Sequence, residues 1–557
     1  MLLLLLMVHL PVLAPIWAQD RTQARSMVIS DRGIVATSQT LASQAGAQVL
    51  ARGGSAIDAA IAANAALSVV EPERAGLGGD LFAIYWDAKT GKLTGINASG
   101  WAPKGLTIDL LKSQGQTGMP LDGIHSVTVP GCVDGWAKLH QRFGKLPWKD
   151  LFQPAIYYAS KGYPVTEIIH ETWHGEIEKL EKDLNGRRVY LKDGQSPKLG
   201  EIFRNPEMAA AYQLIATQGA AAYYRGPIGK AIVKTSQRLG GTISLADLSE
   251  FEAEWVQPVS TDYRGWKVYE LPPNGQGITA LETLNMMAQF PISSYPSRGV
   301  MELHTQIEAQ KLAFADLQHY LADPRFSKVP VDGLIAPHYG RERARLIDPD
   351  KAQCEPAPGN PKTISSNTIY LSVVDREGNI VSLIQSVYQH FGSGVIVDDY
   401  GFALQNRGAL FEFDPDHPNA LAPRKRPFHT IIPAFMEKGS VHIGFGIMGG
   451  LNQGPAHTQF VSNVVDHGMS IQLALEAPRY TKLKFGGCEV LIENRVTKDV
   501  RDGLTAKGHK LTVVGDFSNQ MGGGQAVIHD SATGVNYGAS DPRKDGAAVP
   551  EPHPYWK

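Results

Sequence analysis

The chain has 557 residues, of which 43% are hydrophobic, and a formal net charge of -2. That length allows one large globular unit or up to roughly four domains. Basic and acidic residues are interspersed, which argues against a nucleic-acid-binding surface and against an acidic tail.

The N-terminus carries an apolar run over residues 2–18 that contains two prolines. It is too short to span a bilayer as a stable helix, and no later stretch is apolar and long enough to do so. We predict a signal peptide over residues 1–18, although no Lys or Arg precedes the apolar run. The expected location is therefore periplasmic or secreted, without membrane contact after signal removal. A wrongly assigned start site is the alternative.

Three cysteines, Cys132, Cys354 and Cys488, are far apart in the sequence and form no C-x-x-C pair. Such spacing indicates no disulfide framework. The prediction is three ordinary thiols.

The rest of the chain mixes helical and strand patterns without a strict repeat. Ser55 is placed to cap an alanine-rich helix that includes residues 59–67, and a long helix is predicted over 301–320. Two hairpins are predicted, with strands over 81–86 and 92–96, and over 368–374 and 380–387. Strands framed by helices on both sides predict a layered α/β sandwich.

Residues 351–362 are rich in Pro and Gly and read as a flexible connector. A mobile arm at this place would let two new chain ends separate. A plain surface loop is the alternative interpretation.

Thr368 opens the second hairpin, directly after Asn367. If the chain is cut between these two residues, Thr368 becomes an N-terminal residue whose own α-amine can take the proton from its hydroxyl. An α-amine titrates near ~8 and so can act as a base around neutral pH. A cut at this position would make the threonine a nucleophile.

Several short motifs, in this order, resemble those of the γ-glutamyltranspeptidase family. They are Gly76–Asp80, Val129–Gly131, Gly144–Pro147, Gln153–Ala155, Gly162–Val165, Asp262–Gly265, Leu271–Pro273, Tyr320–Pro324 and the segment around Thr368. The resemblance runs from about residue 30 to the C-terminus, and a dispersed set of this kind is far more specific than any one motif.

The resemblance implies a four-layer αββα sandwich of the N-terminal-nucleophile hydrolase type. Such a precursor cuts itself into two subunits, here residues 19–367 and 368–557, which then remain partners. Thr368 would attack the Asn367 carbonyl and afterwards act as the catalytic nucleophile on a small-molecule amide, without a cofactor. The acyl group would pass to water or to an amine.

Two further elements of the family's machinery carry over by resemblance. Ser386 matches the hydroxyl residue that assists the nucleophile. Gly449 and Gly450 match the pair whose N–H groups form the oxyanion hole, a task that suits glycine because a missing Cβ lets the backbone come close.

The substrate-binding positions depart from the family pattern. Ser99 stands where the family has a carboxylate-binding arginine, and Leu410 where it has an ammonium-binding aspartate. The other replacements are Tyr388, Arg407, His429 and Thr430. Segments 406–408 and 427–433 resemble the branch with cephalosporin acylases and oxamate amidohydrolase.

Both charged clamps for an amino-acid end are replaced, which argues against a γ-glutamyl donor. A pocket with Arg407, His429 and Tyr388 but no carboxylate predicts an acyl group that ends in a carboxylate and lacks an ammonium. The alternative is that other side chains restore recognition of γ-glutamyl donors such as glutathione.

Two other functions compete with this interpretation. His170, Glu171 and His174 form an H-E-x-x-H pattern, which on a helix is typical of zinc metallopeptidases. A solvated polar helix explains the same pattern, and we predict no metal site. A catalytically silent binding protein on the same scaffold is the second alternative. Neither a phosphate-binding glycine loop nor a G-x-S-x-G elbow is present.

Overall fold

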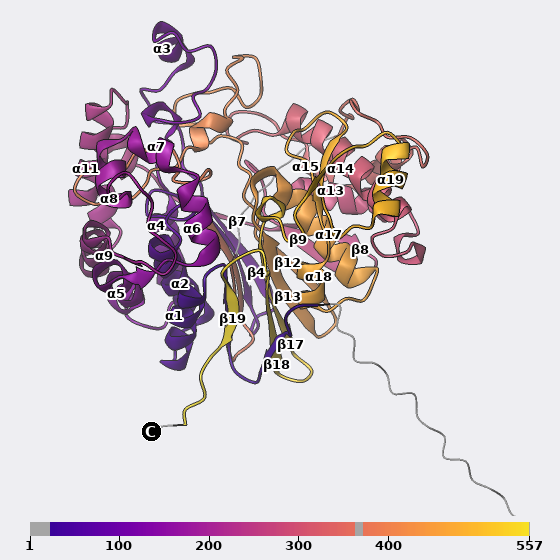
Figure 1. Ribbon diagram of the computed structural model, residues 1–557, viewed down its shortest axis with the longest axis horizontal. Helices are drawn as coiled ribbons and strands as arrows, with labels where there is room; N and C mark the ends of the chain where they lie inside the picture. Colours follow the sequence, from indigo (N-terminus) through magenta and orange to yellow (C-terminus); the bar gives the residue numbers. More distant parts are fainter. Residues whose placement is uncertain (1–22, 362–370, 556–557) are drawn as a thin grey trace, which may run out of the picture.

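The computed structural model describes residues 23–361 and 371–555, and two seven-stranded sheets face each other between layers of helices (Figure 1). The first sheet has the strand order β19-β2-β10-β11-β3-β4-β7, and the second has the order β1-β18-β17-β13-β12-β9-β8. Neighbouring strands in both sheets are antiparallel. The predicted αββα sandwich is confirmed.

The strands of the first sheet are β2 (Ile34–Thr37), β3 (Asp80–Asp87), β4 (Lys92–Ala98), β7 (Glu254–Val256), β10 (Leu371–Val374), β11 (Ile380–Ser386) and β19 (Ala547–Pro550). Those of the second are β1 (Val28–Ser30), β8 (Val259–Tyr263), β9 (Trp266–Glu270), β12 (Ala434–Lys438), β13 (Val441–Ile447), β17 (Gly524–Asp530) and β18 (Val535–Ser540). Two small sheets contain β5 (Tyr163–Pro164) with β6 (Ile202–Phe203), and β14 (Tyr480–Thr481) with β15 (Glu489–Glu493) and β16 (Lys510–Val514).

Helices from the N-terminal part of the chain gather on the side of the first sheet, and later helices gather on the side of the second (Figure 1). The N-terminal group comprises α1 (Thr40–Ala51), α2 (Ala56–Val70), α3 (Ile108–Ser113), α4 (Cys132–Phe143), α5 (Gln153–Lys161), α6 (Glu167–His174), α7 (Ile177–Glu181), α8 (Leu184–Tyr190), α9 (Pro206–Gln218), α10 (Ala221–Tyr224), α11 (Pro227–Arg238) and α12 (Leu245–Ser249). The later group comprises α13 (Gly277–Met287), α14 (Val300–Tyr320), α15 (Val331–Leu334), α16 (Pro337–Ala344), α17 (Gln453–Val465), α18 (Ile471–Glu476) and α19 (Lys498–Ala506).

The side chains of strand β11 contribute in turn to two hydrophobic cores, one on each face of the first sheet. Its side chains point to opposite faces in turn, because a strand repeats every second residue. Val381 and Leu383 join the core under the N-terminal helices, whereas Ile380 and Ile384 join the core between the sheets. The strand is therefore apolar on both faces, as a buried central strand must be.

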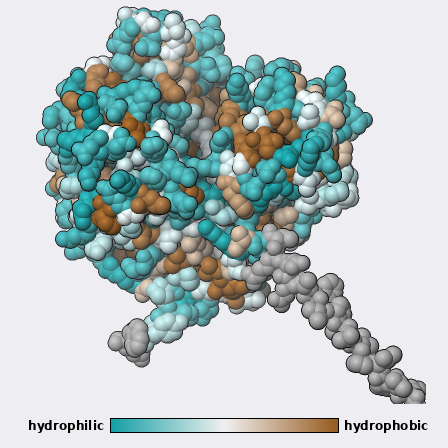
Figure 2. All heavy atoms as spheres, viewed as in Figure 1, coloured by the Kyte–Doolittle hydropathy of each residue, from teal (hydrophilic) through white to brown (hydrophobic). Residues whose placement is uncertain are grey.

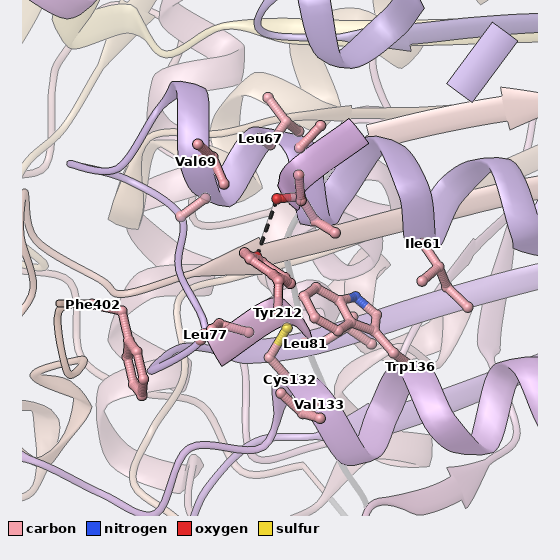
Figure 3. Close-up of a cluster of buried hydrophobic side chains, with 14 of the residues drawn as sticks. Ile61, Leu67, Val69, Leu77, Leu81, Cys132, Val133, Trp136, Tyr212 and Phe402 are labelled. Atoms are coloured by element: carbon pink, nitrogen blue, oxygen red, sulfur yellow. Dashed lines mark hydrogen bonds between the residues drawn. The ribbon is translucent and has the colours of Figure 1, made fainter. Parts of the chain in front are cut away.

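Helix α2 lies inside the N-terminal layer and is buried along its whole length. Its alanines let neighbouring helices approach closely. Trp136 Nε1 donates to Asn64 Oδ1 at 2.8 Å. Tyr212 Oη, labelled in Figure 3, donates to the Ala65 carbonyl at 3.1 Å. The predicted cap is confirmed, since Ser55 Oγ accepts from the Asp58 N–H and Asp58 Oδ2 accepts from the Ser55 N–H.

The other predicted elements are also confirmed. β3 and β4 form the first hairpin, β10 and β11 form the second over its described residues, and α14 covers the predicted long helix. No helix in the described parts of the chain has the length and apolar character needed to cross a membrane. The face in Figure 2 is mostly hydrophilic, with hydrophobic residues in small groups.

The prediction of three ordinary thiols is wrong. Cys354 and Cys488 form a disulfide, and Cys132 is the buried free cysteine. The two bonded cysteines are 134 residues apart in the sequence and meet only because the loop before β15 packs beside the segment after α16. No local spacing could reveal that pairing.

The predicted flexible connector is corrected over residues 351–361. This segment has no helix or strand, but it is fastened at several points besides the disulfide. The Gly359 N–H donates to Asp316 Oδ1 at 2.5 Å, Tyr320 Oη donates to the Gly359 carbonyl at 2.6 Å, and Arg343 Nη2 donates to the Ala357 carbonyl at 3.1 Å. The connector is thus a fixed loop held on helices α14 and α16.

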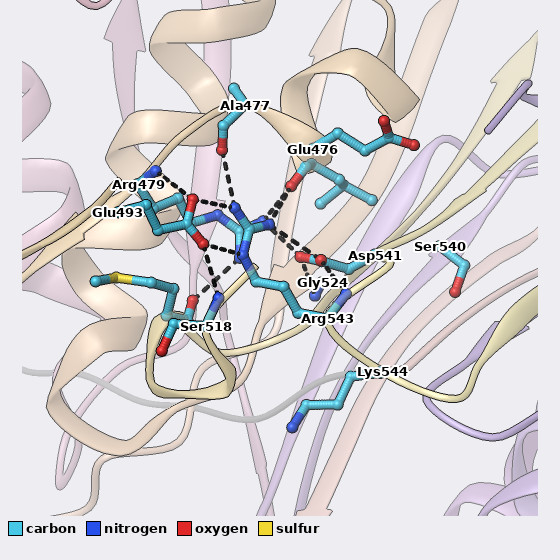
Figure 4. Close-up of polar contacts among 12 residues, drawn as sticks. Glu476, Ala477, Arg479, Glu493, Ser518, Gly524, Ser540, Asp541, Arg543 and Lys544 are labelled. Carbon is cyan, nitrogen blue, oxygen red and sulfur yellow. Dashed lines mark hydrogen bonds and ion pairs between the residues drawn. The ribbon is translucent and has the colours of Figure 1, made fainter. Parts of the chain in front are cut away.

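A buried ion-pair network fixes the segment after β18 (Figure 4). Arg543 donates to Glu493 at 2.6 and 2.7 Å and to Asp541 at 3.0 Å. Arg479 donates to the other Asp541 oxygen at 2.7 Å. Burial alone would raise the pKa of Asp541, but the two arginines hold it below its usual value. The ion pairs therefore hold in place the segment that leads into the C-terminal strand β19.

Candidate active site

A pocket of about 440 Å³ lies where strands of both sheets end. Its wall includes Leu371, Ile384 and Ser386 from the first sheet, and Met448 directly after β13 of the second. The remaining lining residues are Ser38, Asn64, Leu67, Glu71, Arg74, Ala75, Glu176, Gln385, Tyr388, Gln389, His390, Arg407, Thr430, Ile431, Gly449, Gly450, Leu451, Gln453 and Leu483.

The predicted nucleophile Thr368 and its neighbour Asn367 lie outside the described residues. The description resumes at Leu371, the first residue of β10, which lines the pocket. The chain that follows Thr368 therefore enters the first sheet at the pocket wall.

Ser386, the predicted assistant of the nucleophile, is the last residue of β11 and lines the pocket. Its Oγ accepts a hydrogen bond from the Tyr388 N–H at 2.7 Å. Since a hydroxyl both donates and accepts, this bond leaves the Ser386 O–H proton to donate toward another group.

Gly449 and Gly450 form the turn between β13 and α17, together with a short 3-10 helix over Gly450–Asn452. Their φ angles of 135° and 63° suit glycine and strain other residues. Gln276 Nε2 fixes the turn by donating to the Gly450 carbonyl at 2.8 Å. Neither glycine N–H donates to another group within the described residues. Both lie at the positive end of α17, which favours a developing negative charge.

Arg407 is fully buried at the pocket, and its guanidinium is only partly used. Nη1 donates to Thr430 Oγ1 at 2.8 Å, whereas Nε and Nη2 have no hydrogen-bond partner in the described residues. Burial lowers the pKa of Arg407 to about 10, so the group stays charged at neutral pH. Two donors of this buried cation therefore lack a hydrogen-bond partner among the described residues, although the charge of Asp80 lies nearby.

Tyr388 supports Arg407 from one side. The guanidinium carbon lies 4.6 Å from the centroid of its ring, at the distance of a cation–π contact. Tyr388 has a φ of 78°, an unusual value for a residue with a side chain. Such strain persists where the surrounding structure imposes it, here through the Ser386 hydrogen bond.

His429 lies behind this wall rather than in it. Its Nε2 is 2.9 Å from Asp80 Oδ2, and both side chains are fully buried. Burial, with Arg407 and Arg426 nearby, holds the pKa of His429 well below its usual value, so the ring is neutral and Nε2–H donates to Asp80. Burial also raises the pKa of Asp80 to about 7.

Ser99 is not brought into the pocket wall. It is buried, its Oγ donates to Asn97 Oδ1 at 2.7 Å, and its carbonyl accepts from Arg426 Nε at 2.9 Å. Leu410 packs in a separate apolar cluster with Phe428 and Phe485. The predicted binding residues Tyr388, Arg407 and Thr430 do come together.

Two carboxylates on the pocket wall, Glu71 and Glu176, were not predicted from the sequence. Glu71 pairs with Arg74 at 3.4 Å and accepts from Ser38, and Glu176 pairs with His390 at 3.2 Å and Lys179 at 3.3 Å. No spacing signal links these residues, because they come from different elements. Both carboxylates already have cationic or hydrogen-bonding partners.

The zinc alternative gains no support. His170 and His174 lie on α6, but His170 Nδ1 bonds to the Pro197 carbonyl at 2.9 Å and His174 Nδ1 lies 3.5 Å from Ser196 Oγ. Among the described residues, the group with metal-ligand geometry is His304, Glu308 and His509, far from this helix in sequence.

The two facing antiparallel sheets between helix layers, with a glycine turn and a strand-end serine at the pocket, define an N-terminal-nucleophile hydrolase. The family model "Gamma-glutamyltranspeptidase" matches residues 42–551, and the chain belongs to this family.

Known relatives cover nearly the whole chain. The "Glutathione hydrolase-like YwrD proenzyme" of Bacillus subtilis (strain 168) is 38% identical over 94% of this chain and 99% of its own. The "Oxamate amidohydrolase proenzyme" of Klebsiella pneumoniae is 33% identical over 94% of this chain and 99% of its own. The crystal structure of cephalosporin acylase from Bacillus halodurans has a TM-score of 0.90 and 40% identity, and covers 98% of this chain and 100% of its own.

These findings confirm the predicted family and enzyme class. The chain is a self-processing amidohydrolase or acyltransferase of γ-glutamyltranspeptidase type.

Proposed function

We propose that residues 1–18 are removed as a signal peptide and that the precursor cuts itself between Asn367 and Thr368. The large subunit is then 19–367 and the small subunit is 368–557. The proenzyme names of the relatives support processing, and the position of Leu371 in the pocket wall supports this cut site. The disulfide supports export, because such bonds persist in oxidising compartments.

Thr368 is the nucleophile of the proposed reaction. Its α-amine takes the hydroxyl proton as Oγ attacks the substrate amide carbonyl, and Ser386 donates a hydrogen bond nearby. The N–H groups of Gly449 and Gly450 hold the oxyanion of the tetrahedral intermediate. The α-ammonium then returns the proton to the leaving amine. An acyl-enzyme remains on Thr368 and passes its acyl group to water or to an amine, with no cofactor in any step.

The acyl group carries a carboxylate at its far end. The observation behind this substrate class is Arg407, a buried cation of the pocket lining with two donors that lack a hydrogen-bond partner among the described residues. A guanidinium edge binds a carboxylate through two parallel hydrogen bonds. The carboxylate also satisfies donors that are costly to leave unpaired in a buried site. Tyr388 and Thr430 keep the guanidinium in place, whereas His429 and Ser99 are buried outside the pocket lining.

Donors of the γ-glutamyl type are the second candidate. They carry an ammonium as well, and Glu71 and Glu176 are carboxylates on the same wall. We rank them lower because each carboxylate already has partners.

Two experiments test the proposal. The purified protein should yield two fragments, the smaller beginning Thr368-Ile369-Tyr370, while a Thr368→Ala variant should stay uncut and inactive. Glutaryl anilide should have a higher kcat/KM than γ-glutamyl anilide. A single intact chain with full amidase activity would contradict the mechanism, and equal values for the two anilides would contradict the substrate class.

A further inference from the structure

We propose that the Cys354–Cys488 disulfide is a redox-sensitive tether that joins the two subunits after the cut and fixes one wall of the pocket. The inference rests on the proposed cut before Thr368. Cys354 lies on the large-subunit side of that cut and Cys488 on the small-subunit side, so the bond spans the break.

The large-subunit end of the tether is well anchored. The 351–361 loop is held by Asp316, Tyr320 and Arg343, which all belong to the large subunit. Non-covalent contacts cross to the small subunit beside the disulfide, since the Gly487 N–H donates to Glu355 Oε1 at 2.9 Å and the Ala352 N–H donates to the Lys507 carbonyl at 2.7 Å. The bond therefore adds a covalent clamp to an existing contact.

The small-subunit end reaches the pocket through residues 482–488, the loop between β14 and β15. Leu483 in this loop lines the pocket, and Phe485 packs edge-on against Phe314 of α14 at 5.5 Å between ring centroids. Lys482 Nζ donates to the carbonyls of Gly486 and Gly487 and so gives the loop a fixed shape. Fastening Cys488 at the end of this loop restrains the wall that Leu483 forms.

The two cysteines differ in exposure and in neighbouring charge, and these differences determine which sulfur a reductant attacks. Cys354 is exposed, whereas Cys488 is buried and its Sγ lies 3.7 Å from Lys311 Nζ. An incoming thiolate can reach Cys354 first. Lys311 Nζ, which also pairs with Glu308 at 2.6 Å, can donate to a thiolate at Cys488 and stabilise it, and a better-stabilised thiolate leaves faster.

Opening the tether needs a dithiol reductant. Its first thiolate attacks Cys354 Sγ, the disulfide bond breaks, and Cys488 leaves as a thiolate beside Lys311. The second thiolate of the reductant then attacks the mixed disulfide and releases Cys354. The reductant ends as a disulfide, and two electrons have passed to the two cysteines.

Denaturing gels test the tether directly. The processed wild type should run as one band without reductant and as two bands with it, and Cys354→Ser should give two bands in both conditions. Cys132→Ser is the matched control, since this buried cysteine is free and its variant should behave as wild type. Two bands for the wild type without reductant would overturn the tether.

The same gel separates failure of the tether from failure of the cut. One band in both conditions means that the chain is not processed, which overturns the proposed function and the tether with it. Peptide mapping of alkylated wild type gives a readout that needs no variant: a linked pair of peptides containing Cys354 and Cys488 is expected, and three free thiols would overturn the bond.

Two further measurements test the link to the pocket and the order in which the cysteines are attacked. Reduced enzyme should show a KM raised several-fold with little change in kcat, because the loop with Leu483 is loosened while Thr368, Ser386 and the glycine turn are untouched. An unchanged KM would overturn the link to the pocket. Brief treatment with glutathione should place the adduct on Cys354, and an adduct on Cys488 would overturn the proposed order.

Discussion

Asp80 and His429 join the two sheets through one buried hydrogen bond. Asp80 opens β3 of the first sheet, His429 precedes β12 of the second, and His429 Nε2 lies 2.9 Å from Asp80 Oδ2. His429 is followed directly by Thr430, which accepts from Arg407. The pair therefore fixes the position of the proposed carboxylate-binding group from behind.

The raised pKa of Asp80 predicts a specific pH dependence of stability. Its folded value of about 7 exceeds the ordinary carboxyl value of 3.8, so the folded state holds the proton more tightly. This contribution to stability is complete below pH ~4 and is lost as pH rises toward ~7, with an upper limit of about 4 kcal/mol. Unfolding by urea from pH 4.5 to 8, in the uncut Thr368→Ala background, measures it.

Two variants check the assignment. Asp80→Asn should flatten the pH profile in that window, whereas the exposed Asp109→Asn should leave it unchanged. An unaltered slope in Asp80→Asn would show that another group titrates.

Arg407→Met should remove the charged partner of the substrate carboxylate. A hydrogen bond to a charged group is worth about 1.5–3 kcal/mol, so kcat/KM for glutaryl anilide should fall by about 10- to 150-fold. Butyryl anilide, which has the same chain without the carboxylate, should change little. Equal losses for both substrates would indicate general damage to the pocket rather than loss of carboxylate binding.

Gly449→Ala should impair the oxyanion hole. The φ of 135° is strained for alanine, and an added Cβ would lie 3.0 Å from Asn452 Nδ2. Displacing one oxyanion donor costs about 100- to 1000-fold in kcat. Stopped-flow or steady-state kinetics on the processed enzyme measures the loss. Gly439→Ala, also at positive φ but in the turn between β12 and β13 with open space around it, controls for backbone strain alone.

Arg543→Met should strongly destabilise the protein, because Glu493 and Asp541 would lose a buried partner (Figure 4). Breaking a buried ion pair from one side costs about 3–5 kcal/mol. Arg495→Met is a matched control, since Arg495 also pairs with Glu493, at 2.9 Å, but is partly exposed. Its effect should stay near 1 kcal/mol or less. Chemical unfolding of both variants, again uncut, gives the comparison.

His170→Ala should leave kcat and KM within about twofold of wild type, because neither imidazole of α6 is among the residues that line the pocket. EDTA treatment should likewise leave the activity intact. Activity lost in EDTA and restored by Zn²⁺ would return the metallopeptidase alternative.

Elements with local signals were predictable from sequence. The cap at Ser55, the hairpins and α14 follow from capping, alternation and helical periodicity, and Ser386 with the Gly449–Gly450 turn follows from family motifs. Contacts between distant segments were not predictable. Asp80 and His429 are 349 residues apart, and Cys354 and Cys488 are 134 apart. Ser99 was predicted from its motif position to bind substrate in the pocket. Its side chain instead is buried and bonds to Asn97, so a motif match did not give the direction of the side chain.

The strand order has a consequence for how the mature enzyme can come apart. In the first sheet, β10 from beyond the proposed cut lies beside β2 from before it, and the C-terminal β19 lies on the other side of β2. In the second sheet, β12 from beyond the cut pairs with β9 from before it. Each proposed subunit thus supplies strands that complete the other's sheets. Neither has a closed core alone, so dissociation and unfolding should be one event, with or without the disulfide.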